Sequence, residues 1–300
     1  MSPGSDKHED MMQLDRRQVQ RAFDRAAGSY DQAAVLQQRI SQQLTERLDY
    51  IRHEHDVVLD LGCGTGQLSA DLLKKFPQSQ IIAVDISPAM INQAQQRFRE
   101  QISSWRCWLG RAVRPHGVCA MAEQLPVKSS HCDSVISSLT LQWCSDLAQV
   151  FGELRRVLKP GGLLMFTTFG PDTLKELRSS WAAVDNNPRV NQFLDMHDVG
   201  DALLACGFEN PVMDMEKITL TYASVMELMR DLQAIGATNA HPERMRGLTG
   251  KQQLAAMADS YEQFRQPQGL PASYEVIFGH AWLPHTADQT VSVDFLNKVR

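Results

Sequence analysis

Apolar residues alternate along residues 57–168 between short continuous runs and longer stretches with helical spacing. Short runs are typical of strands buried on both faces of a parallel sheet, and helical spacing marks amphipathic helices. The pattern predicts strands over 57–61, 81–84, 133–139 and 163–168, and helices over 67–75, 88–99 and 147–158. Strands alternating with helices in units of this length predict a doubly wound, Rossmann-like α/β sheet with helices on both faces.

The segment from Asp15 to Arg52 has helical spacing throughout. Arg17, Arg21 and Arg25 fall on one face at about 100° per residue. The opposite face carries apolar side chains at Val19, Phe23, Ala26, Ala27 and Tyr30.

The later part of the chain departs from simple alternation. Helices are predicted over 171–184 and 196–206, and strands over 211–222 and 274–282. Between those two strands lies a helical insertion with two apolar stripes, which we expect to close over the sheet as a lid together with the N-terminal helices. The stripes are Val225, Leu228, Met229, Leu232 and Ile235, then Leu254, Met257, Tyr261 and Phe264. Residues 102–120 give no clear assignment.

With 300 residues and 43% hydrophobic content, the chain can form one large domain, or a domain with an appended lid. We expect a tail over 1–14, an N-terminal helical lid segment over 15–55, and a Rossmann-like core over 56–222. A helical lid insertion over 223–270 and a final core strand with a C-terminal tail over 271–300 complete this division.

Charge and cysteine content exclude several function classes. A net charge of −5 with 22% charged residues does not indicate the excess of positive charge that is typical of proteins that bind nucleic acids. The six cysteines form no Cys-x-x-Cys pair and no zinc spacing, so we expect reduced thiols in a cytoplasmic protein and no metal. No apolar stretch is as long as a membrane span, and the polar start is no signal peptide.

The strongest chemical signal is Gly62-Cys63-Gly64-Thr65-Gly66, which follows the first predicted strand. Glycines here permit positive φ and the close approach of a ligand. The next strand ends at Asp85, whose carboxylate can accept hydrogen bonds from both hydroxyls of a ribose. Asp60 precedes the turn, and an anion there disfavours a pyrophosphate but suits a positively charged sulfonium. A purely structural glycine turn remains the alternative.

These residues resemble the first motif of the class I S-adenosylmethionine-dependent methyltransferases. The resemblance implies a mostly parallel sheet with one antiparallel strand, and S-adenosylmethionine as cofactor with S-adenosylhomocysteine as product. It places Gly62, Gly64 and Gly66 around the methionine part, and Asp60 near its amino group. Asp85 would bind the ribose.

The resemblance also suggests the rest of the cofactor site. Many relatives carry Asp where Met121 stands, so the adenine contact is expected to pass to Ala122 and Glu123; a solvated loop acid is the alternative for Glu123. Further cofactor contacts are expected from Gln37, Ile86, Met90, Ser138 and Leu139. Ordinary strand-end packing is the alternative for Ser138 and Leu139.

Segments outside the glycine turn narrow the substrate. Several segments resemble the malonyl-acyl-carrier-protein O-methyltransferases of biotin synthesis, within a resemblance that runs over about residues 15 to 282. They are residues 22–31, 139–144, 166–177, 235–239, Arg244, 247–249 and 270–274. This resemblance implies methyl transfer to the free carboxylate of a malonyl thioester, carried on acyl carrier protein or coenzyme A. A carboxylate is ionised at neutral pH, so alignment and exclusion of water matter more than a general base.

Such a site needs a group that holds the carboxylate. Tyr30, Arg178 and Arg244 are our catalytic candidates. Arg178 lies at the edge of an apolar helical stripe, where a guanidinium can bind a carboxylate with two parallel hydrogen bonds. Each candidate has a structural alternative. Tyr30 could be a core tyrosine, Arg178 an arginine whose head group reaches solvent, and Arg244 a solvated charge on the lid. The substrate channel is expected to include Phe23, Trp143 and Tyr274, with core packing as the alternative for the last two.

The acidic carrier protein is expected to dock on Arg17, Arg21 and Arg25, unless these form an ordinary solvated face. Two other functions remain open. One is methylation of another small carboxylate or of a quinone, and the other is a non-catalytic module that binds S-adenosylmethionine. Nucleic-acid methylation is disfavoured, because no Asn/Asp-Pro-Pro-aromatic motif follows the fourth strand.

Overall fold

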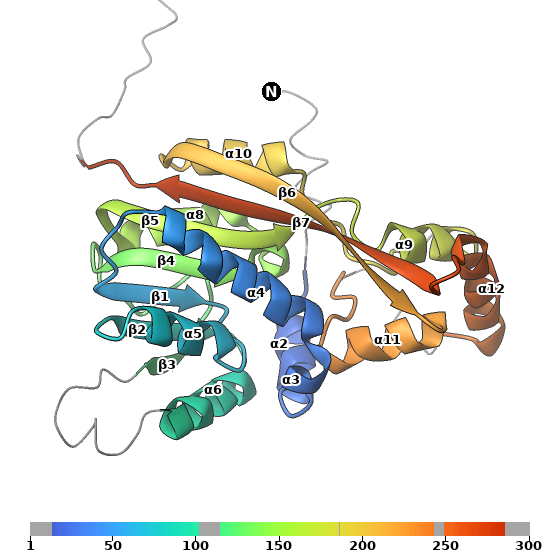
Figure 1. Cartoon of the computed structure of the whole chain (residues 1–300). Coiled ribbons are helices and arrows are strands. Elements are labelled where there is room, and N and C mark those ends of the chain that lie inside the picture. The colour runs from blue at the N-terminus through green and yellow to red at the C-terminus, as the bar shows by residue number, and fades with distance from the viewer. Residues whose placement is uncertain (1–13, 102–114, 186, 243–248, 286–300) are drawn as a thin grey trace, which may run out of the picture.

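The computed structural model describes residues 14–101, 115–185, 187–242 and 249–285. Its sheet has seven strands in the order β3-β2-β1-β4-β5-β7-β6 (Figure 1). The strands are β1 (Val57–Leu61), β2 (Gln80–Asp85), β3 (His116–Cys119), β4 (Cys132–Ser138), β5 (Leu158–Phe169), β6 (Glu209–Tyr222) and β7 (Leu270–Trp282). All pairings are parallel except those of β7, which is antiparallel to both of its neighbours. This confirms the predicted fold class.

Helices cover both faces of the sheet. On one face, α4 (Val35–Arg47) and α5 (Gln67–Lys75) share an apolar cluster with Val58 and Ile136 of the central strands. On the other, α8 (Leu147–Val157) and α10 (Met196–Ala205) pack in a second cluster with Leu59 and Val135. Neighbouring residues of β1 and β4 therefore face opposite clusters. Because both faces of these strands are buried, their sequences are continuous apolar runs.

Helix α6 (Pro88–Gln101) packs along β2 and β3, where its apolar side chains form a cluster with Ala83. The remaining helices gather around the carboxyl ends of the central strands (Figure 1). They are α2 (Arg16–Ala26), α3 (Tyr30–Ala33), α9 (Lys175–Ala182), α11 (Val225–Ala234) and α12 (Lys251–Tyr261). Side chains of α9, α11 and α12 join the same apolar cluster as the sheet. The division into core and lid segments therefore stays a prediction. None of the helices in the described ranges combines the length and hydrophobicity needed to cross a membrane.

Two predicted helices have different limits in the structure. The segment 15–52 breaks at Gly28 and Ser29, so Tyr30 begins α3 and does not continue the first helix. The predicted helix 171–184 begins only at Lys175, because Leu174 has a φ of 53° and ends a preceding turn. A third difference is β3, which lies in the segment 102–120 that had no assignment.

Candidate functional site

A cavity opens at the carboxyl ends of β1, β2, β4 and β5, beneath α2 and α11. In a doubly wound sheet this is the expected place for a ligand, because the strand order reverses between β1 and β4. Most of the residues selected from the sequence line this cavity: Phe23, Tyr30, Gln37, Gly62, Gly64, Asp85, Ile86, Met90, Ala122, Glu123, Ser138, Leu139, Trp143 and Tyr274. The folded chain thus brings together segments that are far apart in the sequence.

The glycine turn has two kinds of glycine. Gly62 and Gly64 have φ values of 73° and 53°, and both line the cavity. A Cβ at Gly62 would lie 1.9 Å from Thr140 Oγ1, whereas a Cβ at Gly64 would meet nothing within 4 Å. Gly62 is therefore required by packing, and Gly64 leaves open space on the cavity wall. Gly66, with a φ of 81°, packs against Ala94 and Phe98 and does not line the cavity.

Asp85 ends β2 at the cavity wall. Its carboxylate accepts hydrogen bonds from the backbone N–H of Gly64 (2.9 Å) and of Ser87 (2.8 Å). Burial raises the pKa of Asp85 to about 6, although both backbone hydrogen bonds partly oppose that rise. The carboxylate is thus held firmly at the turn and is ionised at neutral pH.

Asp60 lies behind the turn and does not line the cavity. Its Oδ2 accepts a hydrogen bond from Ser69 Oγ at 2.5 Å, and its buried Oδ1 has no partner within the described chain. Burial raises the pKa of Asp60 to about 7, with Ser69 opposing the rise and Asp85 adding to it. The predicted contact of Asp60 with a ligand amino group stays a prediction.

The rim of the cavity near Ala122 is closed by an ion pair. Arg16 of α2 contacts Glu123 at 2.9 Å, and the Glu123 side chain is only 8% exposed. Glu123 is therefore no solvated loop acid. Met121 lies outside the cavity lining and is 36% exposed, so its replacement of an acidic adenine contact stays a prediction.

The N-terminal helices are fastened over the glycine turn by carboxylates. Asp24 of α2 accepts a hydrogen bond from Ser87 Oγ at 2.6 Å, and Asp31 of α3 accepts one from Thr65 Oγ1 at 2.6 Å. Tyr30 lines the cavity beside them. Its burial, together with the charges of Asp85 and Asp31, raises the pKa of its phenol, so the hydroxyl stays a hydrogen-bond donor.

Strained backbone marks the far wall of the cavity. Leu139 and Leu174 have φ values of 52° and 53°, which is unusual for residues with a Cβ. Both line the cavity. Leu139 is held in place by its N–H, which donates to the Thr167 backbone oxygen at 3.0 Å. Trp143 follows on the same connection and packs edge-on against Phe23, with ring centroids 5.3 Å apart.

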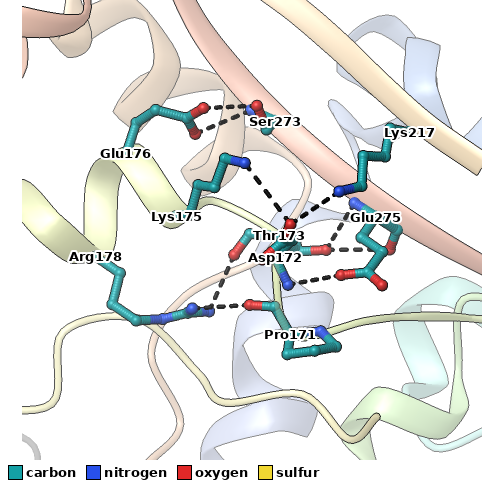
Figure 2. A network of polar contacts seen from close by, with 9 residues as sticks. All are labelled: Pro171, Asp172, Thr173, Lys175, Glu176, Arg178, Lys217, Ser273 and Glu275. Carbon is teal, nitrogen blue, oxygen red and sulfur yellow. Dashed lines mark hydrogen bonds and ion pairs between the residues drawn. The ribbon is translucent and has the colours of Figure 1, made fainter. Parts of the chain in front are cut away.

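The turn before α9 is fixed by a polar network that includes Arg178 (Figure 2). The guanidinium donates to the backbone oxygens of Pro171 (2.8 Å) and Thr173 (3.0 Å), and burial lowers its pKa. Glu275 of β7 accepts from the Asp172 N–H at 2.7 Å, and Glu176 accepts from Ser273 Oγ at 2.6 Å.

Arg178 does not line the cavity. Its predicted role in carboxylate binding therefore gains no support, because the guanidinium is used to hold the backbone of its own turn. Arg244 lies outside the described residues. The three arginines expected to receive a partner, Arg17, Arg21 and Arg25, are all exposed on α2.

Sequence reasoning missed Arg189, which lines the cavity together with Val190, Asn191 and Phe193. These residues belong to no helix or strand, so periodicity does not mark them. Their only sequence signal is a cationic residue beside apolar ones. Thr238 and Asn239, just after the α11 stripe, line the same part of the cavity and were also missed.

Comparison with known proteins gives a consistent result. A family model described as a methyltransferase domain matches residues 59–166. The malonyl-[acyl-carrier protein] O-methyltransferase of Nitrosospira multiformis is 50% identical over 276 residues, covering 90% of each chain. The protein of the same name from Halorhodospira halophila is 45% identical over 299 residues, covering 98% of this chain and 96% of its own.

Solved structures share the fold at low sequence identity. A putative methyltransferase from Bacillus halodurans superposes with a TM-score of 0.57 at 15% identity, over 81% of this chain and 99% of its own. A phosphoethanolamine N-methyltransferase from Haemonchus contortus, solved with S-adenosylhomocysteine, gives 0.52 at 18% identity, over 87% of this chain and 57% of its own.

Proposed function

The chain belongs to the family of malonyl-[acyl-carrier protein] O-methyltransferases, and from this premise we propose that it methylates the free carboxylate of a malonyl thioester. The observation that carries the proposal is the composition of one cavity. Its floor is the glycine turn with Asp85, and its walls are the segments that resemble this family outside the turn, including Tyr30, Trp143 and Tyr274. The product would be the malonyl methyl ester of biotin synthesis.

The cavity floor fits S-adenosylmethionine. Gly64 leaves open space where a Cβ would otherwise point, Asp85 offers an ionised acceptor for ribose hydroxyls, and the apolar Ile86 and Met90 can flank an adenine ring. S-adenosylmethionine, when bound, supplies a methyl group on a sulfonium, so transfer to a carboxylate releases no proton and needs no base. The S-adenosylhomocysteine in the Haemonchus contortus structure supports this proposal only through a shared fold.

The protein's task in this reaction is to align the acceptor and to exclude water. No histidine is among the described residues that line the cavity. Tyr30 cannot act as a base near neutral pH, because its raised pKa keeps the proton on the phenol. We expect it to donate a hydrogen bond that orients the acceptor, while Phe23, Trp143 and Leu139 keep water from the reacting atoms.

The carrier of the malonyl group is expected to be acyl carrier protein. Arg17, Arg21 and Arg25 form an exposed basic stripe on α2, whose opposite face lines the cavity through Val19 and Phe23. An acidic carrier docked there would deliver its thioester beside the cavity, and opposite charge would favour its encounter.

A direct test is mass spectrometry of malonyl-acyl carrier protein after incubation with the enzyme and S-adenosylmethionine. We expect the malonyl thioester to gain the mass of one CH₂, and acetyl-acyl carrier protein, which has no free carboxylate, to gain nothing. Malonyl-coenzyme A serves as the second acceptor and should react less efficiently at equal concentration. Binding of S-adenosylhomocysteine without methylation of any malonyl thioester would contradict the proposal and favour a non-catalytic binding module.

A further inference from the structure

We propose that the wall of the cavity formed by residues 189–191 and 237–239 binds the free carboxylate of the acceptor, through the Arg189 guanidinium and the Thr238 hydroxyl. This inference rests on the proposed function and identifies the group that selects a malonyl over a neutral acyl thioester. It replaces Arg178, which does not line the cavity and whose guanidinium donates to the backbone oxygens of Pro171 and Thr173.

Arg189 is a rigid cation in this wall. Its side chain is only 10% exposed and forms an ion pair with Asp185 at 2.6 Å. It also donates to Thr249 Oγ1 at 2.9 Å, and its guanidinium carbon lies 4.4 Å from the centroid of the Trp181 ring. A guanidinium fixed on three sides loses little side-chain entropy when it binds a carboxylate. Asp185 keeps the cation stable when the acceptor is absent.

Thr238 offers a hydroxyl that lacks a partner. Its Oγ1 is buried and makes no hydrogen bond within the described chain, although the residue lines the cavity. A buried hydroxyl without a partner costs free energy, and most buried polar groups in native proteins are paired. An anionic acceptor in the cavity would supply the missing partner, because the Thr238 O–H can donate to a carboxylate oxygen.

Hydrogen bonds join the two segments into one wall. Asn239 Nδ2 donates to the Pro188 oxygen at 2.5 Å, and the Ala240 N–H donates to Asn191 Oδ1 at 3.3 Å. Arg189 lies between the two accepting residues, and Thr238 directly precedes Asn239. The loop after α9 and the loop after α11 therefore present their donors on the same side of the cavity.

The surroundings make this wall selective. Val190, Phe193, Leu232 and Ile235 line the cavity beside the two donors. Charge-assisted hydrogen bonds are strongest in such apolar surroundings, and a site built to hold a charged group rejects analogues that lack it. A thioester with a free carboxylate fits this wall, whereas a neutral acyl chain offers the Arg189 cation no charge and leaves the Thr238 hydroxyl without an acceptor.

The test compares Arg189→Gln and Thr238→Val with the wild type in methyl transfer to malonyl-acyl carrier protein. Arg230→Gln is the matched control, because it removes the same charge from an exposed position on α11. We expect Arg189→Gln to raise the KM for the malonyl thioester by about 10- to 100-fold and Thr238→Val by about 3- to 10-fold. Arg189→Lys should restore part of the affinity, and the Kd for S-adenosylhomocysteine should stay within about twofold of wild type.

A second measurement separates carboxylate binding from a structural role. Acetyl-acyl carrier protein is used as a competitive inhibitor, because it shares the carrier and thioester but has no carboxylate. Its inhibition constant should be unchanged in both variants. An unchanged malonyl KM, or a parallel rise in the malonyl KM and the acetyl inhibition constant, would overturn the inference while leaving the proposed function intact. Failure of the wild type to methylate the malonyl thioester would instead refute the proposed function.

Discussion

The two halves of the cavity are constructed differently. The half around Gly62, Gly64 and Asp85 comes from two adjacent strand ends, and the backbone shapes it directly. The opposite half is assembled from the loops after β5, α9 and α11 and from Tyr274 of β7. The first and the last of these segments are more than a hundred residues apart in the chain. The half that we propose binds the cofactor is thus a local property of the sequence, whereas the half that we propose binds the acceptor depends on long-range packing.

The largest expected effect concerns the glycine turn. Gly62→Ala adds a Cβ that clashes with Thr140 at a positive φ, so we expect the free energy of unfolding to fall by about 2–4 kcal/mol. Gly64→Ala has a positive φ but no clash, and should lose about 1 kcal/mol. Urea denaturation measures both. Equal losses in the two variants would show that packing against Thr140 does not distinguish these glycines.

The next effect concerns the turn that shapes the acceptor half. Arg178→Gln removes a buried donor from the Pro171 and Thr173 oxygens, which should lower the free energy of unfolding by about 2–3 kcal/mol. Lys217→Gln is the control in the same network, because its ion pair with Asp172 is exposed to solvent and should change the stability far less than Arg178→Gln does. If Arg178→Gln were as stable as wild type but unable to use malonyl thioester, our original assignment of Arg178 would be restored.

A pH effect tests the cofactor half by itself. Burial raises the pKa of Asp85 to about 6, so the carboxylate becomes protonated as the pH falls below that value. The affinity for S-adenosylhomocysteine should then decrease by up to tenfold per pH unit, because a neutral acid is a poorer acceptor for ribose hydroxyls. Calorimetry between pH 5 and 8 (about the range where Asp85 titrates) measures this. In Asp85→Asn the affinity should be lower and this pH dependence should be absent; an unaltered pH profile in that variant would assign the effect to Asp60.

The smallest effect is expected at the rim. Arg16→Gln removes the partner of the mostly buried Glu123, whereas Arg16 itself is 41% exposed. We expect a loss of about 1 kcal/mol or less in unfolding free energy, together with a few-fold weaker binding of S-adenosylhomocysteine. The double variant Arg16→Gln/Glu123→Gln should recover part of both losses, since it leaves no unpaired buried acid. An equal or greater loss in the double variant would exclude this explanation.

The same contrast explains what the sequence could predict. The strand ends at Leu61 and Asp85 and the glycine turn follow from local patterns, because a buried run followed by glycine permits few conformations. The presence of one antiparallel strand was implied by the family resemblance, and the pairings of β7 confirm it; which strand this would be was not predicted.

The errors lie where tertiary contacts override local periodicity. Helical spacing continued through Gly28 and through residues 171–174, but the chain turns there because Asp31, Arg178 and Glu275 hold the turns in place. Arg189 belongs to a loop without any period, and its packing on Trp181, its ion pair with Asp185 and its hydrogen bond to Thr249 hold it at the cavity. No pattern in the sequence records those contacts.

The most direct test of this two-part cavity is steady-state kinetics of Asp85→Asn and Arg189→Gln, with each of the two substrates varied in turn. The account predicts that Asp85→Asn raises the KM for S-adenosylmethionine and leaves that for malonyl-acyl carrier protein within about twofold, and that Arg189→Gln does the reverse. If both variants raised the same KM, or if Arg189→Gln weakened S-adenosylmethionine alone, the division of the cavity between Asp85 and Arg189 would be contradicted.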